Sequence, residues 1–220
     1  MKTAGLLGGI GPESTIDYYR RIIAACDQAP PLVINSIDVR KLLHLLANDR
    51  PGAIDYLARE IQRLADAHVD FAAIAANTPH VVFDEVRERS AIPLINIVDA
   101  VRSAARAAGL KRLAVFGTRI TMRERLYPDA ILPSPEEQDL IHDKYVNELL
   151  NGKFLPQTRD RFLKIVEEMI RRDRIDAVIL GGTELPLLLR EESYRGVTFL
   201  DTTAIHARAI VDAIHSDAAI

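Results

Sequence analysis

A short apolar segment, residues 73–76, ends abruptly in Asn77, Thr78 and Pro79. A proline cannot donate a hydrogen bond to a neighbouring strand, so the pattern predicts a buried strand that stops there. In open α/β sheets, ligands bind at the carboxyl ends of strands, which places Asn77 and Thr78 to contact a small polar molecule. An alternative stays open, in which both residues only cap the helix expected to begin near His80.

The same plan occurs a second time later in the chain. An apolar segment, residues 177–180, is followed by two glycines, Thr183, Glu184 and then a proline. The first strands of the two halves also match, since residues 3–9 and 113–118 both lead into a polar turn and a helix. In each half the second strand end follows the first by roughly 70 residues, which indicates a structural repeat. We expect two similar α/β units that face each other, with a ligand between them.

The rest of the hydrophobic pattern alternates between strands and helices, which is typical of α/β proteins. Apolar residues such as Ile54, Leu57 and Ile61 recur at helical spacing. Strands are expected at residues 3–8, 32–37, 70–76, 93–98, 112–117, 176–181 and 198–201, with a short strand or loop at 126–132. Helices are expected at residues 15–27, 51–68, 81–90, 99–108, 121–126, 136–151, 158–173, 185–190 and 203–215. The last helix is expected to pack back on the N-terminal half.

These elements predict two doubly wound, parallel-sheet α/β domains. The first comprises residues 1–98 together with 206–220, and the second comprises residues 99–205. Gly109 ends a helix just before the first strand of the second repeat, as a helix stop signal should. With 220 residues, of which 48% are hydrophobic, the chain can bury a sizeable core.

Composition and charge argue against two classes of binding partner, nucleic acids and membranes. The formal net charge of −3 and the absence of tryptophan argue against nucleic acid as the main partner. No apolar stretch approaches the roughly 20 residues that span a bilayer, so no membrane is expected. Residues 8–13 interrupt the apolar N-terminal segment, which excludes a signal peptide there and favours the cytoplasm.

The chain has one cysteine, Cys26, which rules out an internal disulfide and a cysteine-rich metal site. Because Cys26 lies in an apolar, alanine-rich segment, it is expected to be a buried small hydrophobic residue and not a reactive thiol. The histidines and acidic residues show no metal-ligand spacing either, so no metal is expected.

The turn after the first strand contains glycines at positions 8, 9 and 11. Glycines let the backbone approach an anion, and the free N–H groups of the following helix would favour a carboxylate or phosphate. The spacing is not that of a dinucleotide-binding turn, and no Walker-type lysine follows. Further along, Arg40 could clamp a substrate carboxylate, although a surface ion pair with Asp38 is the preferred interpretation.

Several motifs resemble those of the aspartate/glutamate racemase family, which contains cofactor-independent amino-acid racemases. Residues 8–15 (GGIGPEST) are similar to the opening G-G-(M/I)-G-P-x-(A/S)-T motif, and residues 77–80 (NTPH) to the end of C-N-T-x-H. Residues 117–122 are similar to G-T-x-x-T-M, and residues 183–186 to the end of G-C-T-E-(L/I)-P. Residues 135–149 resemble the family's linking helix. The resemblance covers nearly the whole chain and implies two domains related by a pseudo-twofold axis, an active site in the cleft between them, no pyridoxal phosphate or metal, and usually a homodimer.

The resemblance also implies which residues bind a small amino acid. These substrate-binding candidates, to which Arg40 is added, are Gly9, Gly11, Asn77, Thr78, Thr118, Thr121 and Thr183. Donors that converge on the ligand's carboxylate would stabilise the carbanion that forms when the Cα proton is removed.

Members of this family use two facing cysteines, of which one removes the Cα proton and the other returns a proton from the opposite face. In this chain Ala76 and Gly182 stand at the corresponding positions, and neither can carry a proton. Cys26 matches neither motif. The usual two-cysteine proton transfer is therefore not expected here.

Four residues remain as candidates for proton transfer: Thr78, His80, Thr183 and Glu184. Threonine hydroxyls are poor bases at neutral pH, so Thr78 and Thr183 are better suited to bind the carboxylate. His80 has a useful pKa but could simply cap or pack, and Glu184 could serve as a base or pair with an arginine. Three functions stay open: a racemase-type isomerase without the cysteines, a catalytically silent or sensing protein that binds an amino acid or small carboxylic acid, and a lyase or isomerase on a small carboxylic acid.

Overall fold

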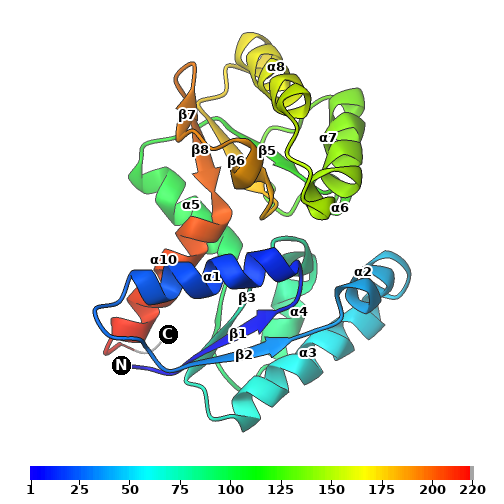
Figure 1. Cartoon of the computed structure of the whole chain (residues 1–220). Coiled ribbons are helices and arrows are strands. Elements are labelled where there is room, and N and C mark those ends of the chain that lie inside the picture. The colour runs from blue at the N-terminus through cyan, green and yellow to red at the C-terminus, as the bar shows by residue number, and fades with distance from the viewer. Residues whose placement is uncertain (219–220) are drawn as a thin grey trace. The chain divides into compact units, whose positions relative to one another are not determined.

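The computed structural model describes residues 1–218, and the chain divides into two compact units (Figure 1). Unit 1 comprises Met1–Ala100 and the chain from Thr203 onward, and unit 2 comprises Val101–Thr202. The division points lie two to three residues from those expected at 98/99 and 205/206. Unit 1 is therefore made from two separate parts of the chain.

Unit 1 contains a four-stranded parallel sheet in the order β2-β1-β3-β4. Its strands are β1 (Ala4–Gly8), β2 (Leu32–Ser36), β3 (Phe71–Ile74) and β4 (Leu94–Ile95). Every residue of β1 and β3 is buried, which is why both read as continuous apolar or small-residue runs in the sequence.

Helices cover both faces of this sheet. They are α1 (Pro12–Ala24), α2 (Val39–Asn48), α3 (Arg50–Asp66), the 3₁₀ helix η1 (Thr78–Val82), α4 (Phe83–Glu88) and α10 (Thr202–His215), while α5 (Ile97–Ala107) contains the division between the units. Leu7 and Ile74 belong to one core with α3 and α4, whereas Leu6 and Ala73 belong to another with α1 and α10. The strand residues thus alternate between two cores.

The last helix packs back on the N-terminal half, as predicted. Ala207, Ile210 and Ile214 of α10 lie in the same buried cluster as Leu6 and Tyr18. At the end of α10, the carbonyl of Ile214 accepts a hydrogen bond from the Lys2 N–H at 2.9 Å.

Unit 2 contains a sheet in the order β5-β6-β8-β7, and one of its strands departs from the expected parallel arrangement. Its strands are β5 (Leu113–Gly117), β6 (Ala177–Gly181), β7 (Ser193–Tyr194) and β8 (Val197–Asp201). β7 runs antiparallel to β8, and the turn between them consists of Arg195 and Gly196, both with positive φ. Two residues with positive φ are typical of a tight hairpin turn, so this strand could not be found from an α/β repeat.

The segment expected as a short strand or loop at 126–132 is a loop with a single strand-like residue. Ile131 forms a parallel bridge with Ala114, while β6 pairs with β5 along its other edge. Since β1 is likewise flanked by β2 and β3, the bridge at Ile131 corresponds to β2.

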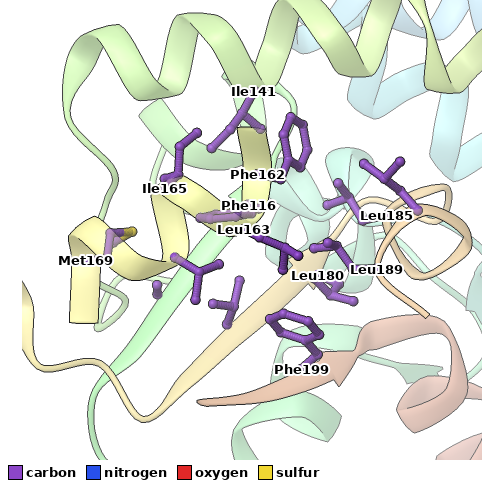
Figure 2. Packing of buried hydrophobic residues seen from close by; sticks show 14 of the residues in the cluster. Phe116, Ile141, Phe162, Leu163, Ile165, Met169, Leu180, Leu185, Leu189 and Phe199 are labelled. Carbon is purple, nitrogen blue, oxygen red and sulfur yellow. The ribbon is translucent and has the colours of Figure 1, made fainter. Parts of the chain in front are cut away.

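One hydrophobic core in unit 2 is formed by one face of the sheet and the helices packed on it. These helices are α6 (Arg119–Arg123), α7 (Pro135–Asn147), the 3₁₀ helix η2 (Leu149–Asn151), α8 (Pro156–Asp173) and α9 (Leu185–Leu188). Phe116 of β5 and Phe162 of α8 meet edge to face, with ring centroids 6.0 Å apart (Figure 2). Leu180, Leu185 and Phe199 belong to the same cluster.

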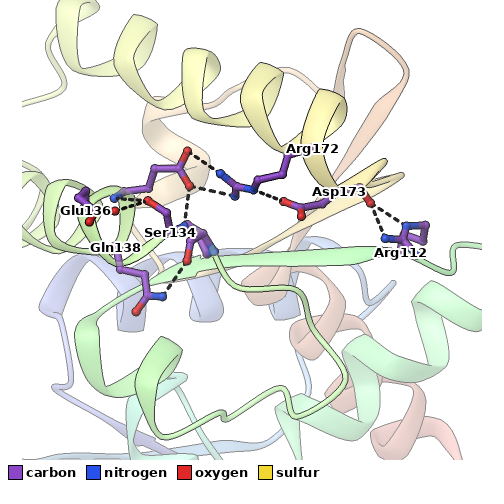
Figure 3. Close-up of polar contacts among 8 residues, drawn as sticks. Arg112, Ser134, Glu136, Gln138, Arg172 and Asp173 are labelled. Carbon is purple, nitrogen blue, oxygen red and sulfur yellow. Dashed lines mark hydrogen bonds and ion pairs between the residues drawn. The ribbon is translucent and has the colours of Figure 1, made fainter.

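The start of α7 is fixed by a capping box at Ser134. The Ser134 hydroxyl accepts the Glu137 N–H at 3.3 Å, and the Glu137 carboxylate accepts the Ser134 N–H at 2.6 Å. Arg172 of α8 pairs with Glu137 at 3.1 Å and with Asp173 at 2.9 Å (Figure 3). The pair between Arg172 and Glu137 ties α7 to α8.

Some predicted boundaries were wrong for identifiable reasons. Helix α2 was missed, although the Asp38 carboxylate caps it by accepting the N–H groups of Arg40 and Lys41 at 2.9 and 3.2 Å. The strand expected at 93–98 has only two residues, because α5 already begins at Ile97. The helix expected at 136–151 ends at Asn147, and η2 takes up the last residues.

Candidate functional site

The turn after β1 requires glycine at position 9. Gly9 has φ +81°, and a Cβ added there would lie 2.5 Å from the carbonyl oxygen of Ile37. The Gly9 N–H donates to the Thr15 hydroxyl at 2.9 Å. Gly11, with φ +88°, is the N-cap of α1 and has no side chain to cap it. The turn therefore lies close to the end of β2, in a backbone conformation that glycine adopts without strain.

The loop after β3 is buried and is held by backbone contacts. The Ala75 N–H donates to the Leu7 carbonyl at 2.9 Å, and the Ala75 carbonyl accepts the Ser14 hydroxyl at 3.0 Å. Ala76, Asn77 and Thr78 are exposed by only 6%, 3% and 8%. Asn77 occupies the N-cap position of η1 but makes no side-chain capping hydrogen bond, so the capping alternative does not account for it.

His80 fixes this loop to the start of α5. Its Nδ1 lies 2.8 Å from the carbonyl oxygen of Ala76, and its Nε2 lies 3.3 Å from the backbone nitrogen of Ile97. These partners assign the proton to Nδ1. Burial and the nearby His206 lower the pKa of His80 to about 3, so the ring is neutral at pH 7. Both ring nitrogens of His80 are therefore engaged with backbone groups.

A second buried histidine lies beside it in unit 1. His206 Nδ1 is 2.9 Å from the Tyr18 hydroxyl, and its Nε2 is 3.2 Å from the carbonyl oxygen of Ile95. The His80 and His206 rings are edge to face, with centroids 6.0 Å apart. Burial lowers the pKa of His206 to about 4. The two rings form a neutral, hydrogen-bonded centre under the loop after β3.

In unit 2, two threonines lie at the end of β5. The Thr118 hydroxyl caps α6 by accepting the Thr121 N–H at 3.1 Å, and the two hydroxyl oxygens are 3.1 Å apart. A Cβ added at Gly117 or Gly181 would lie 3.0 or 3.1 Å from the Thr121 methyl group. Thr121 therefore fills the space beside the ends of both β5 and β6, as Thr15 does beside Gly8 in unit 1.

The loop after β6 brings together Thr183, Glu184 and a tyrosine that the sequence did not single out. The Tyr145 hydroxyl of α7 donates to the Glu184 carboxylate, and the Thr183 hydroxyl donates to the same carboxylate oxygen at 2.9 Å. Tyr145 is 5% exposed and Glu184 is 6% exposed. Burial and the Glu184 carboxylate raise the pKa of Tyr145 well above its ordinary value, so the phenol keeps its proton. Glu184 does not pair with an arginine among the described residues.

Two other predicted residues have different environments from those expected. The Asp38 carboxylate contacts the backbone N–H of Arg40 and not its guanidinium, so the expected surface ion pair was wrong. Arg40 is exposed on α2. Cys26 is half-buried and not fully buried, and burial together with Asp27 raises the pKa of its thiol, which disfavours the reactive thiolate.

Comparisons with known proteins identify the family of this chain. A family model described as Asp/Glu/Hydantoin racemase matches residues 7–210. The chain belongs to this family. The broad specificity amino-acid racemase RacX of Bacillus subtilis is 24% identical over 225 residues, which cover 94% of this chain and 96% of RacX. A glutamate racemase of Aquifex aeolicus is 25% identical over 166 residues, which cover 70% of this chain and 62% of that protein.

Solved structures of Asp/Glu racemase type share the fold of this family member. A candidate Asp/Glu racemase from Yersinia pestis superposes with a TM-score of 0.87 at 27% identity, covering 98% of this chain and 100% of that one. An aspartate racemase homologue from Pyrococcus horikoshii superposes with a TM-score of 0.82 at 28% identity, with the same coverage. The two-domain α/β fold predicted from the sequence is confirmed.

The described residues contain neither a metal-binding cluster nor a membrane-spanning helix. Within residues 1–218, no three histidine, cysteine or acidic side chains gather closely enough to hold a metal ion. In the same part of the chain, no helix combines the length and the apolar character needed to cross a membrane.

Proposed function

We propose that this racemase-family protein binds a small amino acid through the loops at the carboxyl ends of the strands of both units. The observation that carries the proposal is the position of the four family-like motifs. Residues 8–15 and 117–122 begin at the last residues of β1 and β5, and residues 77–80 and 183–186 begin within three residues of the ends of β3 and β6. Ligands of open α/β sheets bind at this end of the strands.

The carboxylate of the amino acid would be held by N–H and hydroxyl donors. The candidates are the backbone of Gly9 and Gly11 and the side chains of Arg40, Asn77, Thr78, Thr118, Thr121 and Thr183. Donors that face a carboxylate stabilise the negative charge that it gains when the Cα proton leaves. This part of the chemistry does not depend on cysteine.

Proton transfer would rely on Glu184. Ala76 and Gly182 carry no ionisable group, His80 is engaged by backbone at both nitrogens, and threonine hydroxyls are poor bases. The Glu184 carboxylate would take the Cα proton: the C–H bond breaks, an O–H bond forms on Glu184, and the electron pair stays on the ligand and spreads into its carboxylate. Inversion then requires a proton on the opposite face of the carbanion, which a water molecule would supply, and the hydroxide left behind would take up the proton from Glu184. We therefore assign the protein as a cofactor-independent isomerase of the racemase type.

A binding or sensing protein is the second candidate. It is favoured by the loop after β3, where Ala76 offers no proton carrier and His80 is committed to the backbone. Racemisation needs a proton delivered to the face opposite the one that loses it. A protein with one acid–base group could bind the amino acid and exchange its proton without inverting it.

Proton NMR in heavy water separates these functions. The purified protein is incubated with a panel of L- and D-amino acids, while loss of the Cα–H signal and optical inversion are followed. Exchange with inversion supports the isomerase, exchange without inversion supports a one-base site, and thermal stabilisation without exchange supports a binder. If no amino acid exchanges or stabilises the protein, the proposal fails beyond the fold.

Substitution of the proposed base provides the matched test. Glu184→Gln keeps the shape of the side chain and should lower the exchange rate at least about 100-fold, the usual contribution of a general base. Glu136→Gln, an exposed carboxylate at the start of α7, should leave the exchange rate unchanged. Exchange that survives Glu184→Gln would assign the proton transfer to another residue.

We also propose that the protein works as a homodimer without pyridoxal phosphate or metal. Light scattering during size-exclusion chromatography tests the dimer. Exchange measured after treatment with a chelator and with a carbonyl reagent, which traps pyridoxal phosphate, tests the cofactor independence. A loss of exchange after either treatment would contradict it.

A further inference from the structure

Position 182 has no side chain, and the Tyr145 ring fills the space where one would lie. A Cβ added at Gly182 would lie 2.5 Å from Cε2 of Tyr145, 2.8 Å from Cζ and 2.8 Å from the hydroxyl oxygen. Real Cβ atoms essentially never approach a non-bonded heavy atom outside their own and the adjacent residues more closely than 3.0 Å. Gly182 does not have a positive φ, unlike Gly9 and Gly11, so its backbone would accept an ordinary residue. The tyrosine ring is what excludes a side chain here.

The Tyr145 ring is held in this place from both ends. Its helix, α7, is fixed at the N-terminus by the capping box of Ser134, and the ring belongs to the buried cluster of unit 2 together with Ile141 and Leu149. Its hydroxyl donates to the Glu184 carboxylate. The ring therefore cannot move away from Gly182 without losing core packing and its buried hydrogen bond to Glu184.

We infer that Tyr145 takes the place of a side chain at position 182: its ring closes that position, and its hydroxyl positions the Glu184 carboxylate at the carboxyl end of β6. The first part stands on the geometry of unit 2 alone. The second part rests on the proposed function, because Glu184 is the proposed base. Tyr145 is in this sense a positioning residue.

The Tyr145 ring would also obstruct a thiol introduced at position 182. Gly182→Cys should fail to fit while the tyrosine ring is present. Tyr145→Phe keeps Cε2 and Cζ and should not relieve the conflict, whereas Tyr145→Leu removes both atoms and should relieve it. The chain thus offers a matched pair of background variants.

The first experiment measures thermal unfolding of Gly182→Ala in three backgrounds. In the unmodified protein and in Tyr145→Phe, the added methyl group should lower the melting temperature by roughly 3 to 10 °C, as overpacking in a core does. In Tyr145→Leu, Gly182→Ala should change it by less than about 2 °C. Equal losses in all three backgrounds, or no loss in any, would overturn the steric part.

If Gly182→Ala alone does not fold, the Tyr145→Leu/Gly182→Ala variant tests whether the Tyr145 ring excludes a side chain at position 182. A folded double variant supports the inference, because only removal of the ring atoms distinguishes it from the single variant. A double variant that also fails to fold, beside a folded Tyr145→Leu protein, would show that something other than the ring excludes the side chain.

The second experiment observes Glu184 directly by carbon-13 NMR of its side-chain carboxyl group, assigned by its loss in Glu184→Gln. Tyr145→Phe removes the hydrogen bond to this carboxylate and should shift its resonance. Ile141→Val, on the same helix and in the same core, should leave the resonance in place. An unmoved resonance in Tyr145→Phe would overturn the positioning role. The absence of Cα exchange with any amino acid would instead contradict the proposed function and leave both NMR and stability results intact.

Discussion

The two units use the same strand plan, yet they finish the loop after their second core strand in different ways. In unit 1 the loop after β3 is closed by His80, whose ring nitrogens contact two backbone groups. In unit 2 the loop after β6 carries Glu184, whose carboxylate accepts hydrogen bonds from Tyr145 and Thr183. The two units thus share the order of their strands and differ in these loops. The loop after β3 holds a neutral histidine, whereas the loop after β6 presents a buried carboxylate.

The loops after the first strands show how closely the plan is repeated. Gly8 and Gly117 end their strands, and a threonine of the following helix packs on each, Thr15 in unit 1 and Thr121 in unit 2. The two units are therefore alike where a side chain must fit against the backbone, as Thr15 and Thr121 do. They differ in the side chains that could take part in proton transfer, His80 in unit 1 and Glu184 in unit 2.

The largest expected effect concerns the neutral histidines of unit 1. Folding lowers the pKa of His80 to about 3 and of His206 to about 4, below the value of about 6.5 in an unfolded chain. Below pH 6.5 the unfolded state therefore binds more protons, and stability that is complete above this pH is lost as the pH falls. We expect the free energy of unfolding to drop by about 2 kcal/mol per histidine between pH 7.5 and pH 5.

Urea unfolding followed by circular dichroism at the two pH values measures this loss. Hydrogen exchange should show that amides of unit 1 lose protection first, because both histidines belong to it. His44→Gln and His215→Gln, on exposed positions, should leave the loss unchanged. A total loss below about 1 kcal/mol would mean that the rings are not held neutral.

A smaller effect should distinguish the two first-strand glycines. Gly8→Ala and Gly117→Ala should each cost about 1–3 kcal/mol in the free energy of unfolding, because their methyl groups would be overpacked. At Gly8 the nearest atom is the Thr15 methyl carbon at 2.5 Å, whereas at Gly117 it is the carbonyl oxygen of Gly181 at 2.8 Å.

The rescue by a second substitution should therefore differ between the units. Thr15→Ser removes the closest atom and leaves the hydroxyl oxygen at 2.8 Å on a side chain that can rotate, unlike a backbone carbonyl, so it should recover part of the loss in Gly8→Ala. Thr121→Ser leaves the Gly181 carbonyl in place and should recover little in Gly117→Ala. Equal rescue in both units, measured by chemical unfolding, would contradict the geometric difference.

The smallest expected effect is at the start of the helices that follow the first strands. Thr118 caps α6 with its hydroxyl, whereas Gly11 precedes α1 without a side chain. Thr118→Ala should destabilise the protein by about 1 kcal/mol, and Thr118→Ser, which keeps the hydroxyl, should cost much less. Chemical unfolding of both variants measures the difference, and identical losses would show that the hydroxyl does not act as a cap.

The sequence predicted the fold well because hydrophobic runs and turn residues determine it locally. The buried strands β1, β3, β5 and β6 were found, since strands covered on both faces read as apolar runs. Helix α2 was missed because Asp38 was interpreted as an ion-pair partner and not as a helix cap. β7 has two residues, too few to produce any periodicity.

The candidate site was harder to predict, because contacts across the chain are not visible in a local pattern. Tyr145 sits on an apolar helix face, where a tyrosine normally indicates core packing, and nothing in the sequence says that its ring reaches Gly182. The partner of His80 Nε2 could not be predicted either, because it is the backbone N–H of Ile97, 17 residues further along the chain. The motif positions around Asn77 and Thr183, in contrast, were visible as strand ends.

The two parts of unit 1 are synthesised at different times, because all of unit 2 lies between them in the chain. One face of its sheet is covered by α10, which leaves the ribosome only after all of unit 2 has been synthesised. Domains generally fold as units while they emerge, at about 5–20 residues per second. Unit 2 can therefore complete its fold first. Until α10 has been synthesised, part of the apolar surface of Leu6 and Ala73 remains uncovered. Nascent chains that stall before α10 would be the ones that most need protection from aggregation.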